Sequence, residues 1–387
     1  MLYKNACIFT AEGQFVRGSF RVENGRFTEL LDFVPEEDGV DLSGATVLPG
    51  LVDLHIHGAV GADFSDADYD GLCAMAGYLA QSGVTAFAPA SMTLPYETLS
   101  RAFAVGKRFH DARPDGCARL AGIHMEGPYF SHQKKGAQNG AYLKEPDIDG
   151  FAKLYEGCGG LIRIVDLAPE LPGAEGFIRA AHTRCTVSVA HTDAGYSDAA
   201  AAFRAGASHL THLFNCMPPI HHRNPGVIGA ASEQDHVTAE LICDGLHIHP
   251  SAVRMAFRLF PGRICLVSDA LRCCGMEDGA YTLGGQTVFL RNGAARLADG
   301  TLAGSATNLF DCLKHAVSFG IPLEEAITAA SSLPARVLGL DHELGSIAPG
   351  NAADFIVCTD TLDRRAVYLS GRRITAVSPT EARKNRD

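Results

Sequence analysis

The fold is predicted most directly by the stretch Thr186–His212, TVSVAHTDAGYSDAAAAFRAGASHLTH. A short run of β-branched and apolar residues at 186–189 is followed by a helix-forming run, Ser197–Ala205. A second short strand-like run begins at His209. A strand, a helix and another strand at this spacing are typical of a βαβ unit, in which the two strands are parallel.

The same alternation recurs along the middle of the chain. Further strand-like runs lie at 85–88, 121–124, 162–165 and 264–267. Expected helices are Pro95–Asp111, Ser251–Leu259, Thr307–Phe319 and Leu323–Leu338. This many βα units over residues 49–343 favour a (β/α)8 TIM-like barrel, in the α/β class, over an open sheet.

Both ends of the chain differ from this middle. Strand-like runs separated by turns lie at 2–9, 17–22 and 26–31, and again at 354–358, 365–369 and 373–377. Chain termini often lie close together in folded domains. We therefore expect residues 1–48 and 344–387 to form one small β-sandwich domain.

Composition limits the partners. The 387 residues include 33 basic and 44 acidic side chains, a formal charge of −11, and 47% are hydrophobic. An acidic surface disfavours nucleic acid and anionic membranes, so we expect neither as a partner. Twelve cysteines without a CxxC motif, no apolar leader after Met1 and no apolar run of membrane-spanning length predict a cytoplasmic protein with reduced thiols.

The segment Val52–Gly58 contains an HxH pair, His55 and His57. Residues two apart on a strand point to the same side, so both imidazoles can reach one cation. The alternative is a pair of histidines in a half-buried strand. The preceding Pro49-Gly50 and the following Gly58 favour metal ligation.

Three further residues end predicted strands or follow them directly: Glu126, His191 and His212. The carboxyl ends of barrel strands meet at one face, where active sites lie. Two imidazoles and a carboxylate form a catalytic zinc set that leaves a position for water. Taken singly, each histidine is interpreted as a core residue and the glutamate as a solvated loop acid. Taken together, the three residues favour a metal site.

Asp269 ends the run Leu266–Val267–Ser268, where it can move protons for a nearby metal site. The alternative is a helix N-cap. His247 is a candidate for substrate contact. Arg223, after His221-His222, is the candidate anion clamp, with an exposed loop charge as the alternative.

Several motifs carry a family resemblance. The segment Gly345–Asp354 and the HxH pair resemble the amidohydrolase superfamily. Motifs that are specific to one family within this superfamily lie in His124–Pro128, Thr211–Pro218, Asp244–His247 and Leu302–Ser305. Together they resemble the N-acetylglucosamine-6-phosphate deacetylases over nearly the whole chain.

The resemblance implies hydrolysis of the acetamide of N-acetylglucosamine 6-phosphate to glucosamine 6-phosphate and acetate. It implies Glu126, His191 and His212 as metal ligands and Asp269 as the acid/base. Retention of His55 and His57 makes a second ion, bridged by Glu126, an expectation. Expected substrate-binding residues are Ala137, Gln138, Asn215, Cys216, Arg223, His247, Leu302, Ala303 and Gly304. Gln138 stands where some members carry a histidine that polarises the acetyl carbonyl.

The expected cofactor is a divalent metal, zinc first and iron as the alternative, with one or two ions per subunit. The expected partners are a small phosphorylated amino sugar and a second copy of the chain, with Arg223 reaching across the dimer. The alternative function is another amidohydrolase, a D-aminoacylase or cyclic-imide hydrolase. Those enzymes often use a carboxylated lysine as the bridging ligand, but here the strand carries Glu126, while Lys134 and Lys135 follow in the loop.

A non-enzymatic barrel acting as a scaffold is the other alternative. Such a protein would usually lack a ligand or the acid, and here every expected position is filled. The sequence therefore favours an enzyme.

Overall fold

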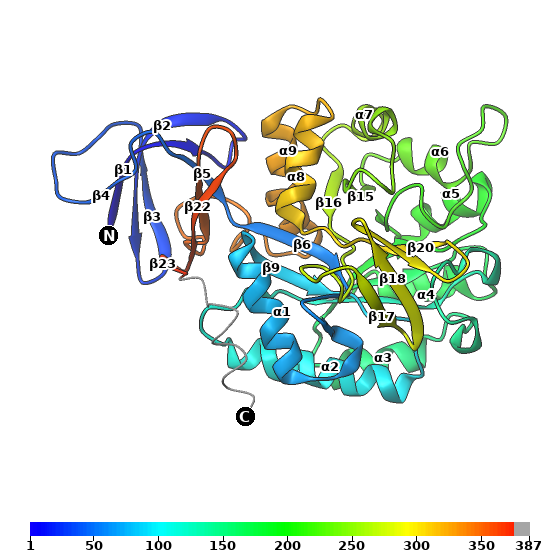
Figure 1. The fold of residues 1–387 in the computed structure, drawn as a ribbon. Helices are drawn as coiled ribbons and strands as arrows, with labels where there is room; N and C mark the ends of the chain where they lie inside the picture. The colour runs from blue at the N-terminus through cyan, green and yellow to red at the C-terminus, as the bar shows by residue number, and fades with distance from the viewer. Residues whose placement is uncertain (375–387) are drawn as a thin grey trace.

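The computed structural model of the chain describes residues 1–374, and its larger part is a barrel of eight parallel strands (Figure 1). Its strands are β6 (Leu51–Ile56), β9 (Val84–Pro89), β11 (Ile123–Tyr129), β12 (Ile162–Leu167), β13 (Thr186–Val189), β14 (His209–Leu210), β15 (Thr238–Ile242) and β16 (Ile264–Val267), and β10 (Arg119–Leu120) pairs with β9. A bridge between Ala90 and His124 joins β9 to β11. The Asp269 N–H donates to the His55 carbonyl at 3.0 Å and links β16 to β6. The (β/α)8 prediction is confirmed.

Helices cover the outside of the barrel because their apolar faces pack on the strands. They are α1 (Tyr69–Gln81), α2 (Tyr96–Ala112), α3 (Ile148–Gly157), α4 (Ala174–Ala181), α5 (Tyr196–Ala205), α6 (Gly226–Ser232), α7 (Pro250–Leu259), α8 (Leu309–Ser318), α9 (Leu323–Ala330) and α10 (Ser332–Val337), with 3-10 turns η1 (Phe64–Asp66), η2 (His132–Lys134) and η3 (Gly140–Tyr142). Phe87 of β9 and Phe103 and Phe109 of α2 are fully buried in this layer. The barrel strands are buried on both faces, which explains their short, mainly apolar sequences.

One expected helix is wrong in its extent. The run Leu323–Leu338 forms two helices, α9 and α10, which are separated at Ser331 with φ −136° and ψ −84°. In a continuous helix the ring of Pro334 would clash with the carbonyl of Ala330. The break puts Pro334 in the first turn of α10, where it needs no hydrogen-bonded N–H.

The two ends of the chain form one eight-stranded sheet beside the barrel (Figure 1). In sheet order the strands are β23 (Arg372–Arg373), β22 (Arg364–Leu369), β21 (Phe355–Cys358), β5 (Thr46–Pro49), β1 (Leu2–Phe9), β2 (Phe15–Glu23) and β3 (Arg26–Leu31), with β4 (Val40–Asp41) paired to β1. A bridge between Arg26 and Ala352 brings β3 back to the chain just before β21. Residues 375–377 of the last predicted strand lie outside the described residues.

A cluster of aromatic rings fills this β domain. Tyr3 stacks on Phe20 with ring centroids 4.9 Å apart. Phe355 contacts both Phe20 and Phe27 from the C-terminal segment. The core of this domain is therefore built by residues more than 300 positions apart, which ties both ends of the chain to one place.

An antiparallel sheet follows β16 and has no counterpart in the sequence prediction. Its strands are β17 (Gly279–Leu283), β18 (Gln286–Arg291), β19 (Ala294–Leu297) and β20 (Leu302–Gly304). Leu283, Val288 and Leu290 pack with Met92 and Leu271 in a small cluster of their own. The two-residue β7 (Gly58–Ala59) and β8 (Ala62–Asp63) pair directly after β6.

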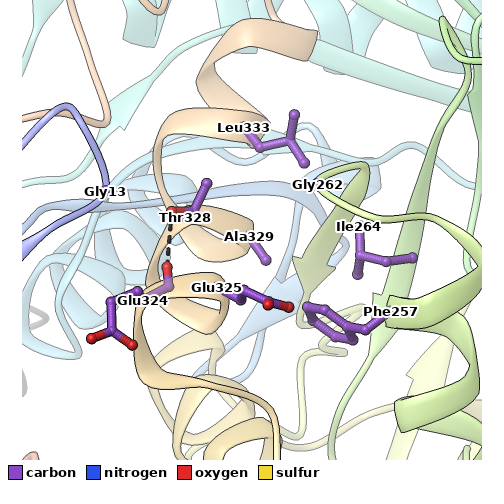
Figure 2. A pocket seen from close by; sticks show the side chains of 9 residues that line it. All are labelled: Gly13, Phe257, Gly262, Ile264, Glu324, Glu325, Thr328, Ala329 and Leu333. Atoms are coloured by element: carbon purple, nitrogen blue, oxygen red, sulfur yellow. Dashed lines mark hydrogen bonds between the residues drawn. The ribbon is translucent and has the colours of Figure 1, made fainter.

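A cavity of about 160 Å³ lies between α7, α9 and the β1–β2 turn (Figure 2). Figure 2 shows Phe257, Ile264 and Leu333 around it, with Glu324 and Glu325 from the start of α9. Because Ile264 begins β16, this cavity lies toward the amino ends of the strands, away from the face where barrel active sites are found.

Within residues 1–374, none of the helices is both long enough and apolar enough to cross a membrane.

Candidate active site

The carboxyl ends of the barrel strands bring together the six residues predicted to do chemistry. His55 lies in β6 and His57 directly follows it, while Glu126 lies in β11. A register irregularity between Asp53 and Ile56, where β6 pairs with β9, adjusts the strand at the HxH pair. The other three residues are His191, His212 and Asp269, which lie two residues past the ends of β13, β14 and β16, respectively.

Glu126 is the shared centre of two groups of ligand atoms. Its Oε1 lies 3.1 Å from His191 Nε2 and 3.3 Å from His212 Nε2. Its Oε2 lies 3.2 Å from His57 Nε2, and His55 Nε2 is 3.8 Å from Oε1. The ligand atoms of each group, Glu126 with His191 and His212, and Glu126 with His55 and His57, lie within 4.8 Å of one another. One carboxylate can therefore bridge two cations.

The other ring nitrogens show how two of these imidazoles are oriented. His191 Nδ1–H donates to the carbonyl of Lys134 at 2.9 Å, and His55 Nδ1–H donates to Glu240 at 2.8 Å. Both histidines are thereby left with Nε2 as the metal-binding atom. His55 Nε2 is buried and has no hydrogen-bond partner within residues 1–374.

This donor set fits a divalent cation. His191 Nε2 and His212 Nε2 lie 3.1 Å apart and face the same carboxylate oxygen, so a shared cation satisfies all three atoms. Imidazole nitrogen and carboxylate oxygen suit zinc, iron and other transition metals alike. The buried histidine and glutamate groups therefore suit a divalent metal centre.

The charges of the site are strongly coupled. Burial alone would raise the pKa of Glu126, but the His57 charge and the hydrogen bonds from His191 and His212 hold it well below its usual value. Burial alone would lower the pKa of His57, but Glu126 and Asp269 raise it well above its usual value. Buried carboxylates here require compensating positive charge, which protons or a metal ion can supply.

Asp269 faces the HxH pair across the seam of the barrel. Its Oδ1 lies 3.4 Å from His57 Nε2 and 3.6 Å from His55 Nε2. Burial alone would raise the pKa of Asp269, but the hydrogen bond from His57 and the nearby imidazoles lower it below its usual value, so the side chain is ionised at neutral pH. The N-cap alternative fails because a bridge and turns, and no helix, follow Asp269.

Several site residues hold a strained backbone. His191, His212, Cys216 and Asp269 have φ of 44°, 32°, 52° and 46°, in the left-handed region that side chains with a Cβ rarely adopt. Strain of this kind persists where the surrounding structure over-determines it, and it gathers at functional sites. Here it turns the chain sharply after each strand, so that the side chains converge.

A cavity of about 200 Å³ opens onto these residues. Eight of the predicted substrate-binding residues line it: Ala137, Gln138, Asn215, Cys216, His247, Leu302, Ala303 and Gly304. Met92 and Thr301 also line it and were not predicted. Leu302, Ala303 and Gly304 form β20. The antiparallel sheet β17–β20, which the sequence did not predict, therefore forms part of the cavity wall.

Two of these lining residues have polar partners that orient them. Gln138 Nε2–H donates to Glu126 Oε2 at 2.8 Å, and Gln138 Oε1 accepts the Thr93 N–H at 2.7 Å. His247 Nδ1–H donates to Asp244 Oδ2 at 2.7 Å. Burial alone would lower the pKa of His247, but Asp244 raises it, so His247 is suited to donate a hydrogen bond from Nε2.

Arg223 is not among the residues that line the cavity. It is exposed on the loop before α6, where Nη1 lies 2.7 Å from His222 Nε2. The structure therefore does not bring Arg223 to the site of its own chain.

Glu240 is the main residue that sequence reasoning missed. It lies in β15, which was not predicted, and it is fully buried with hydrogen bonds to His55, His209 and the His212 backbone. The available signal was a glutamate inside the short apolar run Thr238–Ile242. A charged residue in a buried strand needs a partner, and that run lies between two predicted strands.

No lysine is among the described residues that line the cavity. Lys134 points elsewhere, with its Nζ 3.6 Å from Asp193. The bridging position is held by Glu126. The structure therefore gives no support to the alternative of a D-aminoacylase or cyclic-imide hydrolase with a carboxylated lysine as bridging ligand.

Comparisons with known proteins agree with this geometry. Residues 46–375 match the amidohydrolase family. An N-acetylglucosamine-6-phosphate deacetylase of Vibrio furnissii is 36% identical over 366 residues, covering 93% of this chain and 91% of that protein. An N-acetylgalactosamine-6-phosphate deacetylase of Escherichia coli O157:H7 is 36% identical over 327 residues, covering 84% of this chain and 86% of that protein.

A solved structure shares the fold closely. It is a mutant of the N-acetyl-D-glucosamine-6-phosphate deacetylase of Mycobacterium smegmatis, in complex with N-acetyl-D-glucosamine 6-phosphate. The TM-score is 0.91 at 32% identity, over 97% of this chain and 99% of that chain.

Proposed function

We propose, from the premise that this chain belongs to the amidohydrolase family and within it to the N-acetylglucosamine-6-phosphate deacetylases, that it hydrolyses the acetamide of N-acetylglucosamine 6-phosphate. The products are glucosamine 6-phosphate and acetate. The observation that carries the proposal is Glu126 shared between two pairs of histidines, with ionised Asp269 beside them in a polar cavity.

Glu126, His191 and His212 are proposed to hold one ion, and His55 and His57 with Glu126 to hold a second. When bound, a divalent ion there supplies Lewis-acid chemistry, which makes water more acidic and polarises an amide carbonyl. Zinc is the proposed ion, because two imidazoles and a carboxylate form a common catalytic zinc set. Iron is the alternative that the same ligands allow.

Asp269 is proposed to move the proton. The attacking water gives its proton to the Asp269 carboxylate as oxygen bonds to the acetyl carbon. Asp269 returns that proton to the amine nitrogen as the carbon–nitrogen bond breaks. His247, held through Nδ1 by Asp244, is proposed to donate from Nε2 to the oxyanion that forms on the acetyl oxygen.

The sugar and its phosphate are proposed to occupy the rest of the cavity. Asn215 and Cys216 line it after β14, and Leu302, Ala303 and Gly304 line it from β20. Ala137 and Gln138 contribute the loop after β11, where Gln138 is proposed to act mainly through Glu126 because its amide N–H is already bonded there.

Arg223 is proposed to bind the phosphate of a neighbouring subunit in a homodimer. Its exposure and its absence from the residues that line the cavity of its own chain support action across an interface. A guanidinium matches a phosphate through paired hydrogen bonds. The protein is proposed to work in the cytoplasm, since all twelve cysteines are free thiols.

A second candidate substrate is N-acetylgalactosamine 6-phosphate, which the Escherichia coli relative acts on by name at a similar identity. The two sugars differ only in the configuration of one hydroxyl. Initial rates of acetate release from both phosphorylated sugars and from free N-acetylglucosamine test the choice. We expect the highest kcat/KM for N-acetylglucosamine 6-phosphate, and a higher value for the galactosamine epimer would overturn the assignment.

A further inference from the structure

A further buried carboxylate lies beside the proposed metal ligands. Glu240 is in the middle of β15, and its side chain has no exposed surface. It lines neither of the two cavities described above. β15 pairs with β14, which leads to the proposed metal ligand His212, and with β16, which leads to Asp269.

Its first contact is with the HxH pair. Glu240 Oε2 accepts the Nδ1–H of His55 at 2.8 Å. A carboxylate oxygen accepts, so this hydrogen bond is made by His55 Nδ1 and leaves Nε2 as the ring atom that can face an ion. Such a carboxylate both fixes the ring orientation and raises the basicity of a ligating imidazole.

Its second contact is with the other ligand group. The same Oε2 accepts the backbone N–H of His212 at 3.0 Å, and the Glu240 carbonyl accepts the Leu213 N–H at 2.9 Å. His212 has a φ of 32°, so its backbone needs outside support to keep the turn. Glu240 therefore holds the peptide that aims His212 at Glu126.

The carboxylate is itself fixed from its far side. Glu240 Oε1 lies 3.3 Å from His209 Nε2, and His209 Nδ1 is 2.6 Å from Thr238 Oγ1. Held through both oxygens in a dry interior, Glu240 cannot change its rotamer without breaking several hydrogen bonds. This rigidity is what an orienting group requires.

We propose that Glu240 is the positioning residue that joins the two ion subsites, because one of its oxygens holds both the side chain of His55 and the backbone of His212. This role rests on the metal centre of the proposed function and not on its substrate. Loss of Glu240 therefore removes the ion at His55 and weakens the ion at His212.

A third ion beneath the first two is the rival explanation, since His55, His124 and Glu240 also lie within ligand distance of one another. The two nitrogens of His124 are already used, Nδ1 on the carbonyl of Leu54 at 3.0 Å and Nε2 on Asp166 at 2.9 Å. The His55 Nδ1 that such an ion needs is also occupied. Hydrogen bonding accounts for these atoms without an ion.

The test is a titration of the full-length, metal-free protein with Co²⁺, followed by visible absorption, which reports binding without any turnover. We expect the wild type to take up two ions and Glu240→Leu to take up one. His55→Ala serves as the reference for a protein that keeps only the His191/His212 ion. Glu240→Gln keeps an oxygen acceptor but loses the charge, so we expect two ions, with the one at His55 bound about tenfold more weakly.

Asp166→Leu is the matched control. Asp166 is equally buried on β12, which lies three strands from β15 in the sheet, but its Oδ1 bonds only to His124 and Thr211, which are not ligands. We expect this variant to bind two ions with wild-type affinity. If Asp166→Leu also lost an ion, removal of any buried carboxylate in the barrel interior would have the same effect. That result would overturn the specific role of Glu240 in holding His55 and His212.

Two further results would overturn the proposal. One is a wild type that binds a single ion, and the other is Glu240→Leu binding two ions with wild-type affinity. Should Glu240→Leu fail to fold, Glu240→Gln with unchanged affinity for both ions overturns it equally. Two bound ions without acetate release would leave Glu240 in its role and reject only the proposed reaction.

Discussion

Gln138 and Glu126 form a direct hydrogen bond in which the amide Nε2–H donates to the carboxylate Oε2 at 2.8 Å. The other end of the same amide accepts the Thr93 N–H at 2.7 Å. The amide thereby holds the carboxylate that both ion subsites share. A residue expected to contact substrate is placed to orient a metal ligand.

The first prediction concerns this contact. Gln138→Ala leaves Glu126 Oε2 without its amide donor and free to rotate, so we expect ion affinity to fall about tenfold. Competition with a chromophoric chelator measures the affinity. Gln138→Leu is the informative partner variant, because it keeps the bulk of the side chain without the amide donor and should weaken binding to a similar extent. Unchanged affinity in both variants would show that Glu126 does not depend on this amide.

The second prediction concerns Asp269. Asp269→Asn removes the proton acceptor while keeping the shape of the side chain, so we expect kcat to fall by at least about 100-fold. Metal content and the thermal unfolding midpoint should stay close to wild type. Turnover near the wild-type rate with full metal content would remove Asp269 from the reaction.

The third prediction concerns Arg223 and the dimer. Arg223→Ala should raise KM for the phosphorylated sugar and leave the reaction with free N-acetylglucosamine nearly unchanged. An equal change for both sugars would argue against a phosphate contact.

Subunit mixing shows from which chain the arginine comes. Arg223→Ala and Asp269→Asn subunits, unfolded together and reassembled in equal amounts, form heterodimers with one complete site when Arg223 acts across the interface. At substrate well below KM, about a quarter of the wild-type rate should return, since half of such dimers are mixed and each has one working site. Reassembled activity no higher than the average of the two parents would place Arg223 in its own subunit's site or outside the reaction.

The fourth prediction concerns metal removal. Glu126 and Asp269 are buried and need positive charge nearby, so removal of the ions by a chelator should abolish activity and lower the thermal unfolding midpoint. Adding Zn²⁺ or Fe²⁺ to the metal-free protein should restore both properties. The ion that restores the higher kcat/KM identifies the better cofactor. A chelated protein with full activity would exclude a metal-dependent reaction.

Much of the barrel could be predicted because each strand is buried on both faces and therefore leaves a local apolar signal. The strand at Thr238–Ile242 was missed because Glu240 interrupts its apolar run. The sheet β17–β20 was missed because its strands are partly exposed and mix polar with apolar residues. The single helix predicted at Leu323–Leu338 divides at Ser331, where Pro334 should have signalled the break.

In the site, too, some residues could be predicted from the local sequence, whereas others depend on contacts between distant segments. His191, His212 and Asp269 follow strand ends and Glu126 lies in β11, so their convergence could be inferred from the barrel alone. The role of Glu240 becomes apparent only once distant strands are seen to pack together. Hydrogen bonds between residues far apart in the sequence leave no periodic pattern.

The central claim is that Glu126, its histidines and Asp269 form a metal-dependent centre that removes the acetyl group from N-acetylglucosamine 6-phosphate. The most direct measurement is the release of acetate and of free amine from this sugar phosphate by the zinc-loaded and the metal-free protein. We expect equal amounts of both products from the zinc-loaded protein and neither from the metal-free protein. A fully zinc-loaded, folded protein that releases no acetate would contradict the account.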